Sequence, residues 1–119
     1  MKKTVVIGAT DNPERYAFLA ANRLMEYGHH IVLVGIKPGS INGQEIQLDK
    51  PAIDEVDTVT LYVGPKNQPF WYEYILSLYP KRIIFNPGTE NPEFEERAQK
   101  AGIEVVEGCT LVMLSIGNY

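Results

Sequence analysis

Four short segments of this sequence combine glycine and polar side chains, with a proline inside the segment or directly after it, in a way that suits the binding of an anionic ligand. They span residues 8–12, 35–40, 64–67 and 86–91. Glycine lets a backbone approach a ligand closely, and a helix that follows such a loop points free N–H groups and its positive dipole end at the ligand. The first segment, Gly8-Ala9-Thr10-Asp11-Asn12, runs into the helix-start pattern Asn12-Pro13-Glu14 and is the primary candidate for a phosphate site.

Three cationic side chains lie in or beside these loops. Arg15 is expected in the first turn of a helix, where its charge opposes the positive dipole end, and a bound phosphate would compensate for this. Lys37 and Lys66 follow predicted strands, and each fits either a ligand contact or an ordinary solvated surface position. Thr10 and Asn12 can contact a phosphate or only cap the helix. Both interpretations of these residues remain open.

No catalytic constellation is recognisable. The sequence lacks a serine nucleophile elbow, an H-E-x-x-H motif and a P-loop. His29 and His30 are adjacent at a predicted helix–strand turn, and no third ligand is spaced to complete a metal site. Cys109 is the only cysteine and is interpreted first as a small buried residue. The residues therefore indicate binding rather than catalysis, with neither a metal nor a catalytic residue assigned.

Strand and helix patterns alternate along the chain. The β-branched or apolar runs 4–7, 31–34, 58–63, 82–85 and 103–106 are predicted as strands. Helices are predicted to begin at the two Asn-Pro-Glu tripeptides, with Asn as the cap, and after Asn67. Ala17, Ala21 and Leu24 fall on one helical face, and Gly28 and Gly102 are expected to end their helices.

This alternation predicts an α/β fold, a three-layer Rossmann-like parallel sheet with helices on both faces. The sheet has five strands, or six if 44–48 adds a short strand at an edge, and residues 1–119 form one domain. Residues 110–119 are expected to cover an edge as a helix or strand. One predicted helix carries three aromatic residues, Trp71, Tyr72 and Tyr74. With their spacing they cannot all face the core, which favours a contact with another subunit or a partner protein.

Ligands of such sheets bind beyond the carboxyl ends of the strands, where strand order reverses. The dinucleotide-binding fingerprint G-x-G-x-x-G needs three glycines. Gly8 can be the first, but Thr10 and Pro13 occupy the positions of the second and third. No acidic residue closes the second strand, which disfavours NAD. Lys37 at that place suits a phosphate on the ribose, as in NADP or coenzyme A.

The composition narrows the range of possible binding partners further. The 119 residues carry a formal charge of −4, with 45% hydrophobic and 22% charged residues, so a folded core is expected. The acidic balance argues against nucleic acid. The apolar run after Lys2-Lys3 stops at Gly8, too short for a signal peptide or a membrane span. We expect a soluble, cytoplasmic protein without membrane contact.

The chain resembles the small bacterial CoA-binding domain proteins, which are similar to the CoA-binding domain of the succinyl-CoA synthetase alpha subunit. The first loop, residues 8–16, resembles the family's Gly-Ala-Ser, a polar stretch and then Arg-Tyr or Lys-Tyr. Residues 27–32, with Gly28-His29, resemble its Gly-His-x-Val segment, and Pro38 to Ile46 resembles its Pro-x-x-x-x-Ile-x-Gly segment. The resemblance extends from Thr4 to about Leu111. Ile36-Lys37 before Pro38, and Val63-Gly64-Pro65-Lys66, depart from the usual pattern.

The resemblance implies a stand-alone CoA or acyl-CoA binding protein of regulatory or carrier role. The alternatives are an NADP-type binder or oxidoreductase, and a protein interaction module with a vestigial cleft. It also places a cysteine at Cys109, where a mixed disulfide with the coenzyme thiol is the alternative to simple packing. The implied cofactor-binding residues are Gly8, Ala9, Thr10, Asn12, Arg15, Tyr16, Lys37, Pro38, Val63, Gly64, Pro65 and Lys66.

Overall fold

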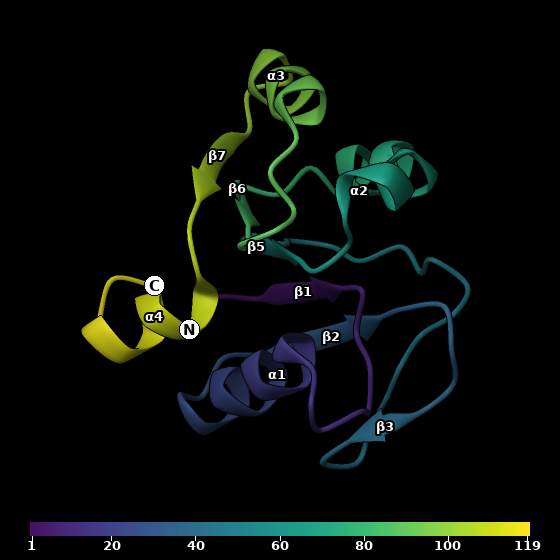
Figure 1. The fold of residues 1–119 in the computed structure, drawn as a ribbon, viewed down its shortest axis with the longest axis vertical. Coiled ribbons are helices and arrows are strands. Elements are labelled where there is room, and N and C mark those ends of the chain that lie inside the picture. Colours follow the sequence, from purple (N-terminus) through teal and green to yellow (C-terminus); the bar gives the residue numbers. More distant parts are fainter.

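The centre of the computed structural model, which describes residues 1–119, is a parallel sheet of five strands in the order β2-β1-β5-β6-β7 (Figure 1). The strands are β1 (Thr4–Ile7), β2 (Ile31–Val34), β5 (Thr58–Leu61), β6 (Arg82–Phe85) and β7 (Glu104–Glu107). Their order reverses between β1 and β5. The predicted Rossmann-like α/β fold is confirmed, and β5 ends two residues earlier than predicted.

Helices cover both faces of the sheet (Figure 1). One face carries α1 (Tyr16–Glu26) and α4 (Thr110–Ile116), which contribute Ala21, Leu24 and Leu114 to a common apolar cluster. The other face carries α2 (Tyr72–Leu78), preceded by the 3₁₀-helix η1 (Pro65–Trp71), and α3 (Pro92–Lys100). The last segment of the chain is therefore a helix that packs beside α1.

The two Asn-Pro-Glu tripeptides have different structures. At the second, Asn91 caps α3 by accepting from the Phe94 N–H, and the Glu95 carboxylate accepts from the Asn91 N–H in return. At the first, the Asn12 side chain accepts from the Glu14 N–H at 3.0 Å in a local turn, and α1 begins only at Tyr16. The prediction that Asn12 caps α1 is therefore wrong, because its side chain is engaged two residues further on.

The predicted helix after Asn67 is two helices. Pro69 lies inside η1, where it cannot donate a backbone hydrogen bond, and the chain becomes α-helical at Tyr72. Trp71, Tyr72 and Tyr74 are all buried, which contradicts the prediction that they could not all face the core. Because the helix type changes at Tyr72, the three side chains point in different directions than in one continuous α-helix. Tyr72 stacks on Phe94 of α3, and the Tyr74 hydroxyl donates to the Pro51 carbonyl oxygen in the 46–57 connection.

The predicted sixth strand is not a full strand of the main sheet. Residues Ser40–Ile41 (β3) and Gln44–Glu45 (β4) form a separate antiparallel hairpin. Only Gln47 reaches the sheet, where it makes a single parallel bridge to Val34 of β2. The free edge of β2 is thereby covered at its carboxyl end alone.

Candidate functional site

A large cavity opens at the carboxyl ends of the strands, beside the point where strand order reverses between β1 and β5. Its volume is about 870 Å³, within the range of sites for small molecules and cofactors. Its walls come from the loop after β1, the start of α1, the loop after β2, the segment from the end of β5 through η1, and the loop after β6. The lining residues are Gly8, Ala9, Thr10, Arg15, Tyr16, Ala17, Ile36, Lys37, Tyr62, Val63, Gly64, Lys66, Asn67, Pro69, Phe70, Trp71, Pro87, Gly88 and Thr89.

Nine of the twelve predicted site residues line this cavity. Asn12, Pro38 and Pro65 do not. Asn12 belongs to the turn before α1, and its side-chain oxygen is already occupied by the Glu14 N–H. Pro38 lies just beyond Lys37 on the exposed loop after β2, and Pro65 is the first residue of η1.

All charged side chains that line the cavity are cations. Arg15, Lys37 and Lys66 contribute, and no aspartate or glutamate is among the lining residues. The chain as a whole has 15 acidic and 11 basic residues, so this local excess opposes the overall balance. None of the three takes part in an ion pair; the salt bridges of the protein involve Arg23, Lys81, Arg97 and Lys100. The cavity therefore has a positive lining suited to an anion.

The first turn of α1 supplies hydrogen-bond donors to the same place. Arg15 is the N-cap residue in extended conformation, and no side chain caps the helix. The backbone N–H groups of Tyr16 and Ala17, both cavity-lining residues, therefore have no acceptor within the protein. Free N–H groups at the start of an eleven-residue helix, together with its dipole, favour a negatively charged ligand group.

The glycines around the cavity have two different roles. A Cβ at Gly8, where φ is +91°, would lie 2.8 Å from the Tyr62 carbonyl oxygen, and one at Gly35 would lie 2.7 Å from the Ala9 carbonyl oxygen. These two glycines allow the loops to pack on each other. At Gly64 a Cβ would meet no protein atom within 4 Å, so the space beside this glycine is open on the cavity wall.

Gln68 fixes the distance between two walls of the cavity. Its side chain is fully buried, and its amide nitrogen donates to the carbonyl oxygens of Val63 at 2.9 Å and Thr89 at 2.6 Å. The Gln68 side-chain oxygen accepts from Asn91, whose amide also donates to the Tyr72 hydroxyl. Gln68 thus ties η1 to the loops that follow β5 and β6.

A buried polar cluster lies behind the cavity, on the α4 side of the sheet. The Asn86 side chain donates to Thr60 and accepts from the Thr110 N–H, and the two threonine hydroxyls share a hydrogen bond of 2.8 Å. The Tyr62 hydroxyl is buried beside them without a hydrogen bond of standard geometry, and burial raises the pKa of its phenol. This cluster holds α4 on the ends of β5 and β6.

Cys109 and the two histidines lie outside the cavity lining. Cys109 is half-buried as the residue before α4. His29 accepts a hydrogen bond from the Lys2 N–H and contacts the Tyr119 ring, near the amino ends of the strands. Across the whole chain, no three His, Cys, Asp or Glu side chains gather in a group that could hold a metal ion.

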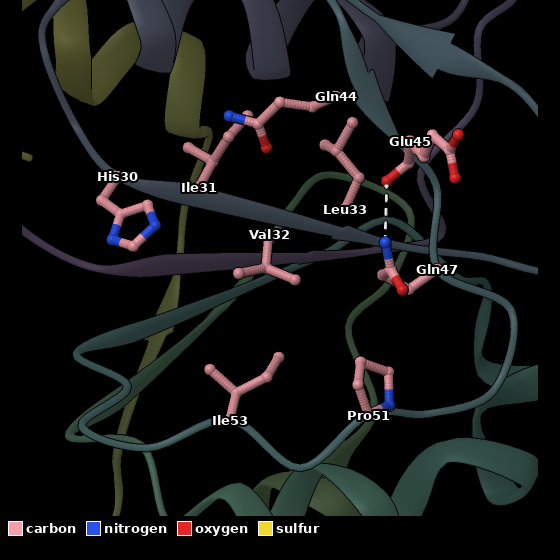
Figure 2. A pocket seen from close by; sticks show the side chains of 9 residues that line it. All are labelled: His30, Ile31, Val32, Leu33, Gln44, Glu45, Gln47, Pro51 and Ile53. Atoms are coloured by element: carbon pink, nitrogen blue, oxygen red, sulfur yellow. Dashed lines mark hydrogen bonds between the residues drawn. The ribbon is translucent and has the colours of Figure 1, made fainter.

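A second, smaller hollow of about 410 Å³ lies along the free edge of β2 (Figure 2). Its lining includes His30, Ile31 and Leu33 from β2 and the turn before it, with Gln44 and Glu45 from the β3–β4 hairpin opposite. No lysine or arginine lines it. The edge hollow thus lacks the cations and free helix N–H groups that distinguish the larger cavity.

Sequence reasoning missed the apolar part of the cavity lining. Tyr62, Pro69, Phe70 and Trp71 all contribute, as does Ala17, whereas Ile36, Asn67 and residues 87–89 lie within the predicted ligand loops 35–40, 64–67 and 86–91. The 3₁₀ geometry of η1 brings Pro69, Phe70 and Trp71 to the cavity, and an ordinary α-helix pattern does not predict it. The usable signal was Pro69 itself, because a proline three residues after Lys66 disfavours an uninterrupted α-helix.

Comparison with known proteins agrees with this fold. A family profile described as a CoA binding domain matches residues 2–115. A crystal structure described as that of an uncharacterized protein is 57% identical, with a TM-score of 0.98 over 100% of this chain and 98% of that chain. A Thermus thermophilus structure is 25% identical, with a TM-score of 0.86 over 99% and 90% of the two chains. A hypothetical protein from Pyrococcus horikoshii is 26% identical, with a TM-score of 0.87 over 97% and 82%.

None of the curated proteins matches the chain. None of its helices has the length and apolar character that crossing a membrane requires.

Proposed function

Since the chain belongs to the CoA-binding domain family, we propose that it binds coenzyme A in the cavity at the carboxyl ends of the strands. The observation that carries this proposal is the charge of the lining: three unpaired cations and no carboxylate, in a protein of net charge −4. Coenzyme A carries a diphosphate and a ribose 3′-phosphate, which need such partners when they leave water.

Two groups of residues divide the phosphates between them in this proposal. The Tyr16 and Ala17 N–H groups, with Arg15 and Thr10, hold the diphosphate at the start of α1. Lys37, on the loop after β2, binds the 3′-phosphate of the ribose. Gly64 provides a wall without a side chain, where the ligand approaches the backbone closely.

The role that follows is binding rather than turnover. The cavity lining contains no histidine, cysteine, aspartate or glutamate, so we assign no catalytic residue. We propose a stand-alone cytoplasmic protein of regulatory or carrier role.

A panel of ligands in thermal unfolding tests this function. Coenzyme A, acetyl-CoA, NADP and NAD are each added at matched concentrations. A ligand at about 100 times its Kd adds about 2.7 kcal/mol to the free energy of unfolding. Stabilisation by the two coenzyme A species above that by NADP and NAD is the expected result. Stabilisation by NADP alone would replace the proposal with an NADP-type binder, and no shift with any ligand would favour an interaction module.

A further inference from the structure

One wall of the cavity is apolar, and its central residue is exposed. Pro69, Phe70 and Trp71 of η1 all line the cavity, and 63% of the Phe70 surface is exposed. Large apolar side chains normally gain free energy by burial, so an aromatic ring left open beside a cavity is suited to contact with an apolar ligand group. This apolar wall, residues 69–71, contains no charged side chain.

Lys50 holds the apolar wall from outside the cavity. Its ammonium group donates to the Phe70 carbonyl oxygen at 2.6 Å, and it lies 3.7 Å from the centroid of the Phe70 ring and 5.1 Å from that of Trp71. Lys50 itself does not line the cavity. The contact therefore fixes both the backbone and the ring of Phe70 without occupying the ligand's space.

The backbone at Lys50 supports a specific role for this contact. Its φ is +49°, in the left-handed region that residues with a side chain rarely adopt. Such a conformation persists where surrounding contacts impose it. Nearby, the Tyr74 hydroxyl donates to the Pro51 carbonyl oxygen at 2.7 Å, so the 46–57 connection is fastened to η1 and α2 at two adjacent residues.

The division of the cavity indicates which part of the ligand meets the apolar wall. The proposed phosphate contacts are at the start of α1 and on the loop after β2, so the charged end of coenzyme A is placed on other elements. The remaining arm ends in a thiol that carries acyl groups as thioesters. We propose that the apolar wall contacts the acyl chain, so that the site prefers acyl-CoA to free coenzyme A, with Lys50 as the positioning residue for Phe70. This inference rests on the proposed function.

The test compares the affinities of coenzyme A, butyryl-CoA and hexanoyl-CoA by calorimetry. Each methylene group that becomes buried raises affinity about threefold to fourfold. Hexanoyl-CoA is therefore expected to bind the native protein at least about tenfold more tightly than coenzyme A, with butyryl-CoA between them. Equal affinity for all three ligands overturns the inference and leaves the proposed function standing. No binding of any of them contradicts the proposed function as well.

Matched variants assign the preference to the wall. Phe70→Ala is expected to remove most of the preference for hexanoyl-CoA, because it should lower the affinity for hexanoyl-CoA more than the affinity for coenzyme A. Ile116→Ala, which truncates an exposed apolar side chain on α4, serves as the control and should leave both affinities unchanged. An equal loss of affinity for both ligands in Phe70→Ala would mean that the ring contacts the common part of the coenzyme, and the inference would fail.

A separate set of variants tests the role of Lys50. Lys50→Met keeps the length of the side chain but removes its charge, and should reduce the acyl preference as Phe70→Ala does. Lys50→Arg keeps a cation and a hydrogen-bond donor, so this variant should retain the acyl preference. Lys81→Met, at an exposed lysine of the turn before β6, controls for the loss of one charge. A full acyl preference in Lys50→Met would remove Lys50 from the proposal.

Discussion

Arg15 is the residue whose position most clearly links the sequence to a ligand. Its charge stands at the N-terminus of α1, where the helix dipole disfavours a cation, and it has no acidic partner. The position of Arg15 beside the cavity was predictable from the sequence, because the loop that joins β1 to the next helix lies at the carboxyl end of the strand, where ligands of such sheets bind. The apolar contribution of Phe70 was not, since an exposed apolar side chain has no sequence signal that separates it from a core residue.

We expect Arg15→Glu to weaken coenzyme A binding at least about tenfold, because a charged hydrogen bond is lost and a like charge faces the phosphates. The exposed Arg15 side chain makes no ion pair, so the thermal unfolding temperature should change little. Arg23→Glu, in the last turn of the same helix, is the matched control in calorimetry. Unchanged affinity in Arg15→Glu would remove this residue from the site.

Gly64 allows a steric test of where the ligand lies. Its φ of −64° and ψ of 155° suit alanine, and a Cβ there meets no protein atom within 4 Å. Gly64→Ala should therefore fold normally but weaken coenzyme A binding about tenfold, since a methyl group would occupy ligand space. Gly108→Ala, whose Cβ would make only ordinary contacts outside the cavity, is the control. Equal affinities in calorimetry would place the ligand away from Gly64.

At the scale of elements, the two Asn-Pro-Glu tripeptides explain what local sequence can and cannot predict. The second is followed by Phe94, which is fully buried, and by Glu95, which completes the cap. The first is followed by Arg15 and Tyr16, both exposed. The buried Phe94 side chain holds the start of α3 on the core, whereas Arg15, at the corresponding position after the first tripeptide, is exposed. The same cap residues therefore begin a helix at one place and a turn at the other.

Gln68 connects elements that the sequence alone does not bring together. Gln68→Leu would leave the Val63 and Thr89 carbonyl oxygens and the Asn91 amide without this partner inside the protein. We expect a loss of about 3 kcal/mol in the free energy of unfolding in urea, because buried unpaired polar groups are costly. Gln99→Leu, exposed on α3, should be near neutral. A loss in Gln68→Leu no larger than in this control would mean that Gln68 does not brace the cavity.

At the scale of the whole molecule, residues from both ends of the chain meet at the amino ends of the strands. The Tyr119 hydroxyl hydrogen-bonds Thr4 at 2.6 Å, and its ring contacts His29 and lies over Arg82. Burial lowers the pKa of His29, and the positive charges of the Met1 amino group, Lys2 and Arg82 add to this effect. Protonated His29 also could not accept the hydrogen bond from the Lys2 N–H.

This environment predicts a loss of stability on mild acidification. Because the folded-state pKa of His29 lies below its ordinary value of 6.5, the unfolded chain binds more protons as the pH falls through 6.5, and the folded state loses stability there. His29→Asn keeps an acceptor but does not titrate, so its unfolding temperature should fall less between pH 7.5 and 5.5. His30→Asn is the neighbouring control. Parallel pH profiles for the native protein and His29→Asn would contradict this account.

The most direct test of the account is an amide NMR titration of the protein with coenzyme A. The binding of phosphates by the start of α1 predicts the largest shifts at the Tyr16 and Ala17 N–H groups, which lack acceptors in the free protein, with further shifts at Thr10 and Gly64. The amides of Ile31 and Leu33, along the edge hollow of β2, should remain unchanged. Shifts confined to that edge, or no shifts at saturating coenzyme A, would contradict the central claim that this cavity binds the coenzyme.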